Sequence, residues 1–429
     1  MNPHQMTWGF AYGFQFAFII GALTVVAWIF SKEPKKIPIR TLTVLMGTML
    51  VWISVTTFYA EMPDLAYVKW KQNFKILGFT LVTVALMYTR ERLDALIWVI
   101  VLSIGFFAVK GGLFTILSGG SFRVWGPPNS MIEDNNALAL ATIMVVPLAR
   151  YLHMHAKNRW IRYGLLLSMP LMVASAVGSY SRGAFVAMSV MALFMWQRSR
   201  HRIWIGIVIA IVASGVISLM PDKYFARIDT IGDYQEDASA MGRIEAWTFA
   251  ARYAADHPIL GGGFGVFGNK DLWDKYLDTY ARVRSPHSIY FEVLGQHGFV
   301  GLGIFLLVGA MALWNAGWIV RRAKTRPDLL WARDLGAMTQ ASLAGYATGG
   351  AFLNLAFLDL YWHLVAIVVI ARVLVERALS AAPAMEPATA AMAGRQPKPV
   401  SFLRKPGSGT RPYRRSSVGR NRAPKDSSA

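Results

Sequence analysis

The sequence predicts an all-α polytopic membrane protein with about 11–12 transmembrane helices and one large, partly helical loop. Of its 429 residues, 55% are hydrophobic and only 16% are charged, whereas soluble proteins carry roughly 25% charged residues. The apolar residues gather in runs of roughly 20, the length that a helix needs to cross ~30 Å of hydrocarbon. These runs are continuous rather than alternating, which argues against an outer-membrane barrel.

We expect eleven apolar runs to cross the membrane. They are residues 10–30, 38–58, 74–88, 93–109, 135–151, 160–177, 184–196, 203–219, 298–320, 335–358 and 361–378. The loops after the first, third, fifth, seventh and ninth runs are rich in Lys and Arg, and so is the C-terminal tail. Basic loops stay in the cytoplasm, so the remaining loops are expected outside. The net charge of +20 is then mainly a topology signal, and nucleic acid is not an expected partner.

This topology divides the chain into four parts. Residues 1–220 hold the N-terminal transmembrane helices, with an outer loop at 111–134, and residues 221–297 form the large outer loop. Residues 298–379 hold the C-terminal transmembrane helices. Residues 380–429 should be a disordered, basic cytoplasmic tail, because they lack the apolar content that offsets ordering entropy. An odd number of spans places Met1 outside, so either the short N-terminus is translocated or a first helix is missing from this start.

Composition also narrows the chemistry. The chain has no cysteine, which excludes disulfides, thiolate metal sites and cysteine nucleophiles. The glycine-rich residues 261–265 lack the Gly-Lys-Ser/Thr ending of a phosphate-binding P-loop, and no Asp-x-Asp pair is present to hold a divalent metal. The composition is thus compatible with chemistry that uses neither a metal nor a cofactor.

Cationic side chains recur on the expected outer side of the membrane. They are Arg123, Arg182, Arg243, Arg284 and His287. Guanidinium groups suit phosphate oxygens, and a histidine can accept a proton near neutral pH. Arg182 and His287 also have structural interpretations. Arg182 could anchor at the membrane interface or pair with an acidic residue, and His287 could cap a helix. The functional hypothesis depends on their convergence.

Two segments of the large loop have helical patterns. Residues 241–256 carry Ile244 and Trp247 at helical spacing, which predicts an amphipathic helix with Arg243 near its positive end. Residues 271–282 form a second candidate helix. Aromatic side chains such as Trp247 could stack on sugars, although packing is the alternative.

Three stretches resemble those of a known family. They are residues 179–183 (SYSRG), residues 242–247 (GRIEAW) running into 257–265 (HPILGGGFG), and residues 286–295 (PHSIYFEVLG). A Ser-Arg-Gly turn, a Gly-Arg-x-x-x-Trp helix and a His-Ser helix start recur in this order around one large periplasmic loop in the O-antigen ligase and polymerase superfamily. The chain resembles that superfamily over about residues 135–305. Its first ten residues are similar to the exosortase-associated branch, whose members are labelled O-glycosylation ligases.

The resemblance implies a GT-C-like protein of the bacterial inner membrane with a periplasmic active site and metal-independent, inverting glycosyl transfer. The donor would be a glycan on undecaprenyl pyrophosphate. On this hypothesis His287 is the general base, while Arg182 and Arg243 neutralise the departing pyrophosphate. The expected diphosphate or sugar contacts are Arg284, Arg123, Trp247, Tyr180 and Gly263. Gln296 departs from the family pattern, in which an acidic residue is common.

The acceptor stays open among three classes. Lipid A–core, the acceptor in lipopolysaccharide biosynthesis, is favoured over a protein hydroxyl and over another glycan chain. A transporter or flippase is the alternative outside the enzymes, although the chain shows no internal repeat of the kind that many transporters have.

Overall fold

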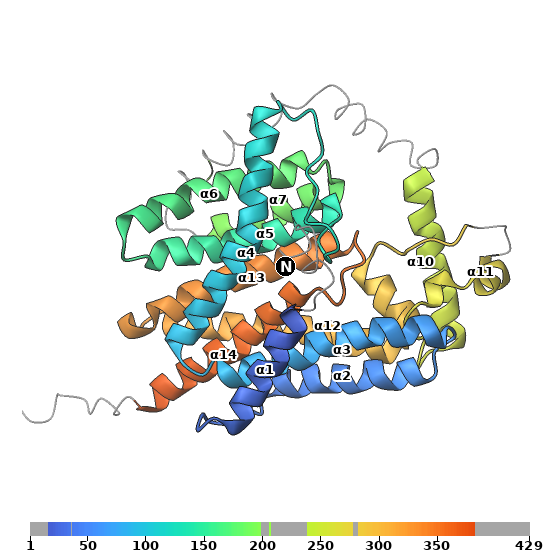
Figure 1. The fold of residues 1–429 in the computed structure, drawn as a ribbon, viewed down its shortest axis with the longest axis horizontal. Helices are drawn as coiled ribbons and strands as arrows, with labels where there is room; N and C mark the ends of the chain where they lie inside the picture. Colours follow the sequence, from blue (N-terminus) through green and yellow to red (C-terminus); the bar gives the residue numbers. More distant parts are fainter. Residues whose placement is uncertain (1–15, 36, 199–205, 207–237, 278–281, 382–429) are drawn as a thin grey trace, which may run out of the picture. The chain divides into compact units, whose positions relative to one another are not determined.

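The computed structural model describes residues 16–35, 37–198, 206, 238–277 and 282–381. The span expected at 203–219, part of the large loop and the basic tail lie outside these residues. The α-helices are α1 (Phe16–Phe30), α2 (Thr41–Phe58), α3 (Pro63–Leu86), α4 (Arg90–Leu117), α5 (Asn135–His155), α6 (Arg159–Gly178), α7 (Arg182–Arg198), α10 (Ala238–Asp256), α11 (Lys270–Leu277), α12 (Ile289–Ala323), α13 (Leu330–Gly350) and α14 (Asp359–Ala381), with short 3₁₀ helices η2 (Val266–Gly268) and η3 (Pro327–Leu329) (Figure 1).

Five helices of the described chain are long and apolar enough to cross a membrane. They are α2, α4, α5, α6 and α12. No strand occurs among the described residues, so the protein is an all-α, multi-pass membrane protein, and the expected fold class is confirmed. Helices α1 and α7 have only 15 and 17 residues, and the span expected at 203–219 lies largely outside the described residues.

Helices α5, α13 and α14 are buried along most of their length. The apolar part of α5 is 83% buried, and α5 packs against α4, α6, α7 and α13, whereas α14 packs against α3, α12 and α13. The Asp134 carboxylate accepts the N–H groups of Asn136 and Ala137 at 2.9 and 3.3 Å. This cap satisfies N–H groups that have no partner within the helix, and it sets the start of α5.

Three helix boundaries differ from those expected. Helix α4 continues to Leu117, because Gly111 and Gly112 let it pack closely on α6, so the loop expected at 111–134 begins at residue 118. Helix α13 ends at Gly350, which leaves residues 351–358 outside any helix instead of inside the span expected at 335–358. The boundary expected between residues 297 and 298 is a kink within α12, where Gly298 has φ 67°.

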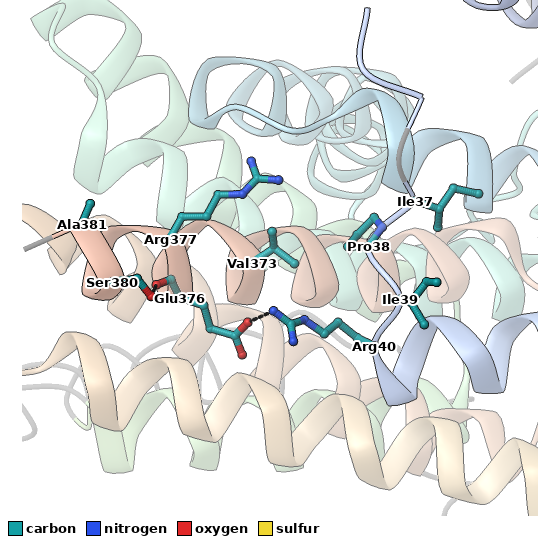
Figure 2. A pocket seen from close by; sticks show the side chains of 9 residues that line it. All are labelled: Ile37, Pro38, Ile39, Arg40, Val373, Glu376, Arg377, Ser380 and Ala381. Carbon is teal, nitrogen blue, oxygen red and sulfur yellow. Dashed lines mark hydrogen bonds and ion pairs between the residues drawn. The ribbon is translucent and has the colours of Figure 1, made fainter.

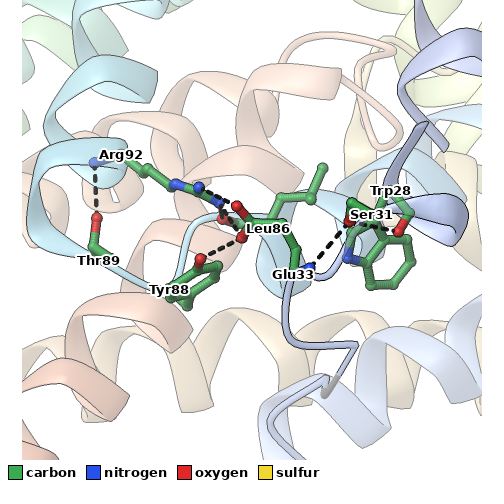
Figure 3. A network of polar contacts seen from close by, with 7 residues as sticks. All are labelled: Trp28, Ser31, Glu33, Leu86, Tyr88, Thr89 and Arg92. Carbon is green, nitrogen blue, oxygen red and sulfur yellow. Dashed lines mark hydrogen bonds and ion pairs between the residues drawn. The ribbon is translucent and has the colours of Figure 1, made fainter.

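The basic loops meet at one end of the bundle, which we call the basic end. Glu33, after α1, accepts hydrogen bonds from Tyr88 and from Arg92, whose Nη2 lies 2.9 Å from the carboxylate (Figure 3). Arg40 pairs with Glu376 of α14 in a pocket between residues 37–40 and the end of α14 (Figure 2). Arg40 and Arg92 at this end are therefore each paired with a carboxylate.

The described part of the large loop packs around its own aromatic cluster. Helices α10 and α11 with η2 enclose Phe249, Tyr253, Phe267, Trp273 and Tyr276, and the Phe249 and Trp273 rings stack at 4.9 Å. Helix α10 covers the helix expected at 241–256, but its buried face carries Phe249 and Tyr253. Ile244 is 40% exposed, so the apolar face expected from Ile244 and Trp247 is wrong. Helix α11 covers only Lys270–Leu277 of the segment expected at 271–282; residues 278–281 lie outside the described residues, and residue 282 is not helical.

Candidate active site

The turn between α6 and α7 carries Tyr180 and Arg182. Asn135 Nδ2 donates to the Ser179 carbonyl at 2.7 Å, and the Tyr180 hydroxyl donates to the Gly120 carbonyl. Ser181 Oγ accepts the Ala184 N–H at 3.1 Å, which caps α7 and places Arg182 in its first turn. The start of α5 and the end of α4 thus both hold the turn in place.

Residues 282–288 lead into α12 and carry Arg284 and His287. His287 is exposed between Pro286 and Ser288, which are buried. The Pro286 carbonyl accepts a hydrogen bond from Trp247 Nε1 at 2.6 Å. His287 has φ 43°, a left-handed conformation that costs a residue with a side chain about 1–3 kcal/mol and is often kept at functional sites. The buried neighbours therefore hold the imidazole in a strained, outward position.

Helix α10 supports this segment from the large loop. The Trp247 ring stacks on Phe291 of α12 at 5.1 Å, and Arg284 Nε lies 3.9 Å from Glu245 Oε2. The guanidinium of Arg284 lies against Gly242, where a Cβ would come within 2.2 Å of Nη1. Because α10 begins at Ala238, Arg243 lies in its second turn, further from the helix start than the helix expected at 241–256 would place it.

Charges near His287 bias its protonation. The protein around the ring displaces part of its water, and this desolvation lowers the pKa of His287. The positive charge of Arg243 lowers that pKa further, whereas the carboxylate of Asp134 raises it. The imidazole makes no hydrogen bond to another residue of the described chain. A histidine in this state is neutral at pH 7 and keeps a nitrogen lone pair for an incoming proton.

Residues 351–358, between α13 and α14, connect the two turns. A Cβ on Gly183 would lie 3.1 Å from Phe352 Cβ, so this segment packs beside Arg182. Asn354 Nδ2 donates to Ser285 Oγ, and the Ala356 N–H donates to Glu292 of α12 at 3.2 Å. The segment thus lies against residues next to both Arg182 and His287. Sequence reasoning missed it because its apolar residues were assigned to a span; Gly349 and Gly350 were the available signal of a helix end.

Arg123 and Gly263, the other expected site residues, lie outside residues 282–288. Arg123 is exposed and adjoins Val124, whose N–H donates to the Gly178 carbonyl at 3.1 Å, so it lies beside the Tyr180 turn. Gly263 lies where the loop packs on α2: its N–H donates to the Gln296 carbonyl at 2.8 Å, and a Cβ would lie 2.3 Å from that of Ala60. A substrate contact by Gly263 stays a prediction.

Two families match parts of the chain. Residues 167–306 match the family described as O-Antigen ligase, a range that contains Arg182, Arg243 and His287. Over these residues the chain is similar to the O-antigen ligase family. Residues 1–157, which include Arg123 and Asp134, match a family of unknown function, DUF5935. No curated protein matches the chain.

The O-antigen ligase match ends before α13. Residues 351–358 therefore lie outside the matched range, although they pack between the two turns that it contains. The residues around His287 and Arg182 consequently have neighbours from both matched ranges and from the C-terminal helices.

Proposed function

We propose that the protein is an O-antigen ligase, a glycosyltransferase that moves a glycan from undecaprenyl pyrophosphate to lipid A–core at the periplasmic face of the bacterial inner membrane. The observation that carries this proposal is the exposed, strained His287 with its lowered pKa beside Arg243. The family match supports ligase-type glycosyl transfer. The donor, the acceptor and the sidedness belong to the proposal.

The proposed reaction is a single displacement. An acceptor hydroxyl oxygen attacks the anomeric carbon, its proton passes to His287, and the bond from that carbon to the pyrophosphate oxygen breaks with its electron pair on the oxygen. Such proton transfer typically contributes 10²–10⁴-fold to a rate. Inversion at the anomeric carbon follows from one attack on the face opposite the leaving group.

Charge on the departing pyrophosphate has to be neutralised. Arg182 and Arg243 are the proposed clamp, and Arg284 and Arg123 assist, because guanidinium groups match phosphate oxygens. Donors aimed at developing charge contribute about 3–4 kcal/mol each. The proposed clamp uses no divalent metal and no cofactor.

Sugar contacts follow from the surface near His287. Tyr180 and Trp247 are half-buried, and each already donates a hydrogen bond to a backbone carbonyl. The Tyr180 ring and the face of the Trp247 ring opposite Phe291 are the proposed contacts for the sugar. The alternatives of a protein hydroxyl or a second glycan chain as acceptor use the same donor and the same base.

The test is transfer in vitro with purified protein, undecaprenyl-pyrophosphate glycan, lipid A–core and excess chelator, with products resolved by mass. Modified lipid A–core, formed by the wild type and lost with His287→Ala, is the expected result. A lengthened glycan on a bare acceptor would identify a polymerase instead. Transfer to a purified protein acceptor alone would identify an O-glycosylation ligase. Full activity of His287→Ala would contradict the assignment of the base.

A further inference from the structure

One face of α3 combines cationic and aromatic side chains outside the group around His287. It consists of Tyr67, Trp70, Lys71, Phe74 and Lys75, which we call the α3 face. Tyr67 is 54% exposed and Phe74 is 40% exposed, and both lysines are exposed. Side chains three and four residues apart lie on the same side of a helix, so these five form a continuous surface.

The aromatic rings of the α3 face order its lysines. The Tyr67 and Trp70 rings stack at 5.7 Å, and the Trp70 and Phe74 rings lie 5.1 Å apart. Lys71 Nζ is 5.0 Å from the centre of the Tyr67 ring, one turn earlier on the helix, and Lys75 Nζ is 4.6 Å from the Phe18 ring of α1. Helical side chains tilt toward the helix N-terminus, so the Lys71 ammonium points toward the start of α3.

The α3 face runs alongside a membrane-spanning helix. Trp70 Nε1 donates to Ser54 Oγ of α2 at 2.9 Å, and α2 is one of the candidate spans. Ser54 lies four residues before the end of that span at Phe58, which corresponds to ~6 Å along the helix. Lys75 follows Trp70 by more than one turn and therefore lies deeper. A lysine at such a depth is costly unless it meets water or a negative charge.

The described chain offers these two lysines no negative charge. Neither Lys71 nor Lys75 takes part in an ion pair or a hydrogen bond with another residue of the described ranges. Asp64 precedes Lys71 by seven residues, or ~10 Å along the helix. Residues 1–15, which precede α1, contain no Asp or Glu. Like charges four residues apart also destabilise each other, so an anion between the lysines would relieve both costs.

We propose that Lys71 and Lys75 bind the phosphate headgroup of an anionic membrane phospholipid, whose acyl chains lie along the apolar surfaces of α1 and α3. Basic side chains near the bilayer surface attract anionic lipids, and aromatic side chains are enriched at that level. The site does not depend on the transfer reaction, because none of its residues belongs to the group around His287.

The experiment is native mass spectrometry of the full-length protein in detergent, titrated with phosphatidylglycerol or with phosphatidylcholine of the same acyl chains. The wild type should retain phosphatidylglycerol more strongly. Lys71→Gln and Lys75→Gln should each weaken that binding about fivefold, and the double variant about 25-fold. Lys71→Arg and Lys75→Arg should keep it. Lys275→Gln is the matched control, because Lys275 lies 5.0 Å from the Tyr276 ring on α11 of the large loop and should leave lipid binding unchanged.

Three results would overturn the proposal. The first is equal retention of the two lipids by the wild type. The second is unchanged phosphatidylglycerol affinity in the double Gln variant when it unfolds at the wild-type temperature; if that variant does not fold, the single variants decide the question in the same way. The third is retention of a polyprenyl diphosphate without retention of phosphatidylglycerol, which would assign the lysines to a different lipid.

Discussion

The two turns of the candidate site have the same construction but different side-chain environments. Tyr180 and His287 both adopt a left-handed backbone conformation, with φ 58° and 43°, and each lies between two buried residues. The Tyr180 hydroxyl is bonded to the Gly120 carbonyl, whereas the His287 imidazole has no hydrogen-bond partner in the described chain. With the same backbone conformation, the Tyr180 side chain is held by a hydrogen bond to the loop, whereas the His287 side chain stays available to accept a proton.

The largest expected effect is a difference in transfer rate between variants of His287 and a variant of Tyr180. His287→Ala and His287→Asn should lower the transfer rate by about 10²–10⁴-fold, because the proton acceptor is lost. Tyr180→Phe should retain most of the activity and instead lose roughly 1 kcal/mol of stability with its hydrogen bond. Initial rates and thermal unfolding in detergent measure both effects. Equal loss of activity in Tyr180→Phe would mean that the rings do not differ in role.

A second change tests the cations next to each turn. Arg182→Ala and Arg243→Ala should each reduce the transfer rate by about 10²–10³-fold, as removal of one donor to developing charge commonly does. Arg326→Ala is the control, since Arg326 pairs with Asp328 in the loop before α13 at 2.8 Å and lies outside both turns. A comparable loss of rate in the control variant would point to general instability.

The pH dependence of the transfer rate tests the protonation state of His287. The lowered pKa of His287 predicts that the rate falls only below about pH 6.5, because the neutral imidazole is the active form. Arg243→Gln removes a positive charge, so it should raise the pKa of His287 and shift the fall of the residual rate to higher pH. Asp134→Asn removes a negative charge and keeps a capping side chain, so it should shift the fall of the rate to lower pH. Shifts of the same sign in both variants would contradict this electrostatic account.

The smallest expected effect comes from backbone strain. Glycine adopts positive φ without the steric cost that a Cβ brings, which is about 1–2 kcal/mol. His287→Gly should therefore be more stable than His287→Ala by about 1 kcal/mol, and Tyr180→Gly should exceed Tyr180→Ala similarly. Unfolding temperatures of the four variants provide the measurement. An advantage of Ala over Gly at either position would show that the turn is unstrained there.

Some of this architecture follows from short-range patterns. Continuous apolar runs predict the membrane helices, and apolar residues at helical spacing predict that residues 241–256 are helical. They do not identify the buried face of α10, since Ile244 is exposed and Phe249 and Tyr253 are buried. Helix ends are less evident where apolar residues continue past them. Gly111 and Gly112 extend α4 through close packing on α6, and the apolar residues 351–358 leave the helix that their hydropathy suggests.

Composition and neighbours along the chain predict a multi-pass membrane protein, the two motifs with Arg182 and His287, and the superfamily that these motifs resemble. Helix packing, in contrast, places residues 351–358 beside Gly183 and Ser285 and brings Trp247 to the Pro286 carbonyl. Within the described residues it also gives Lys71 and Lys75 no acidic partner. Such contacts join residues far apart in sequence, and they exist only once helix packing has brought those residues together.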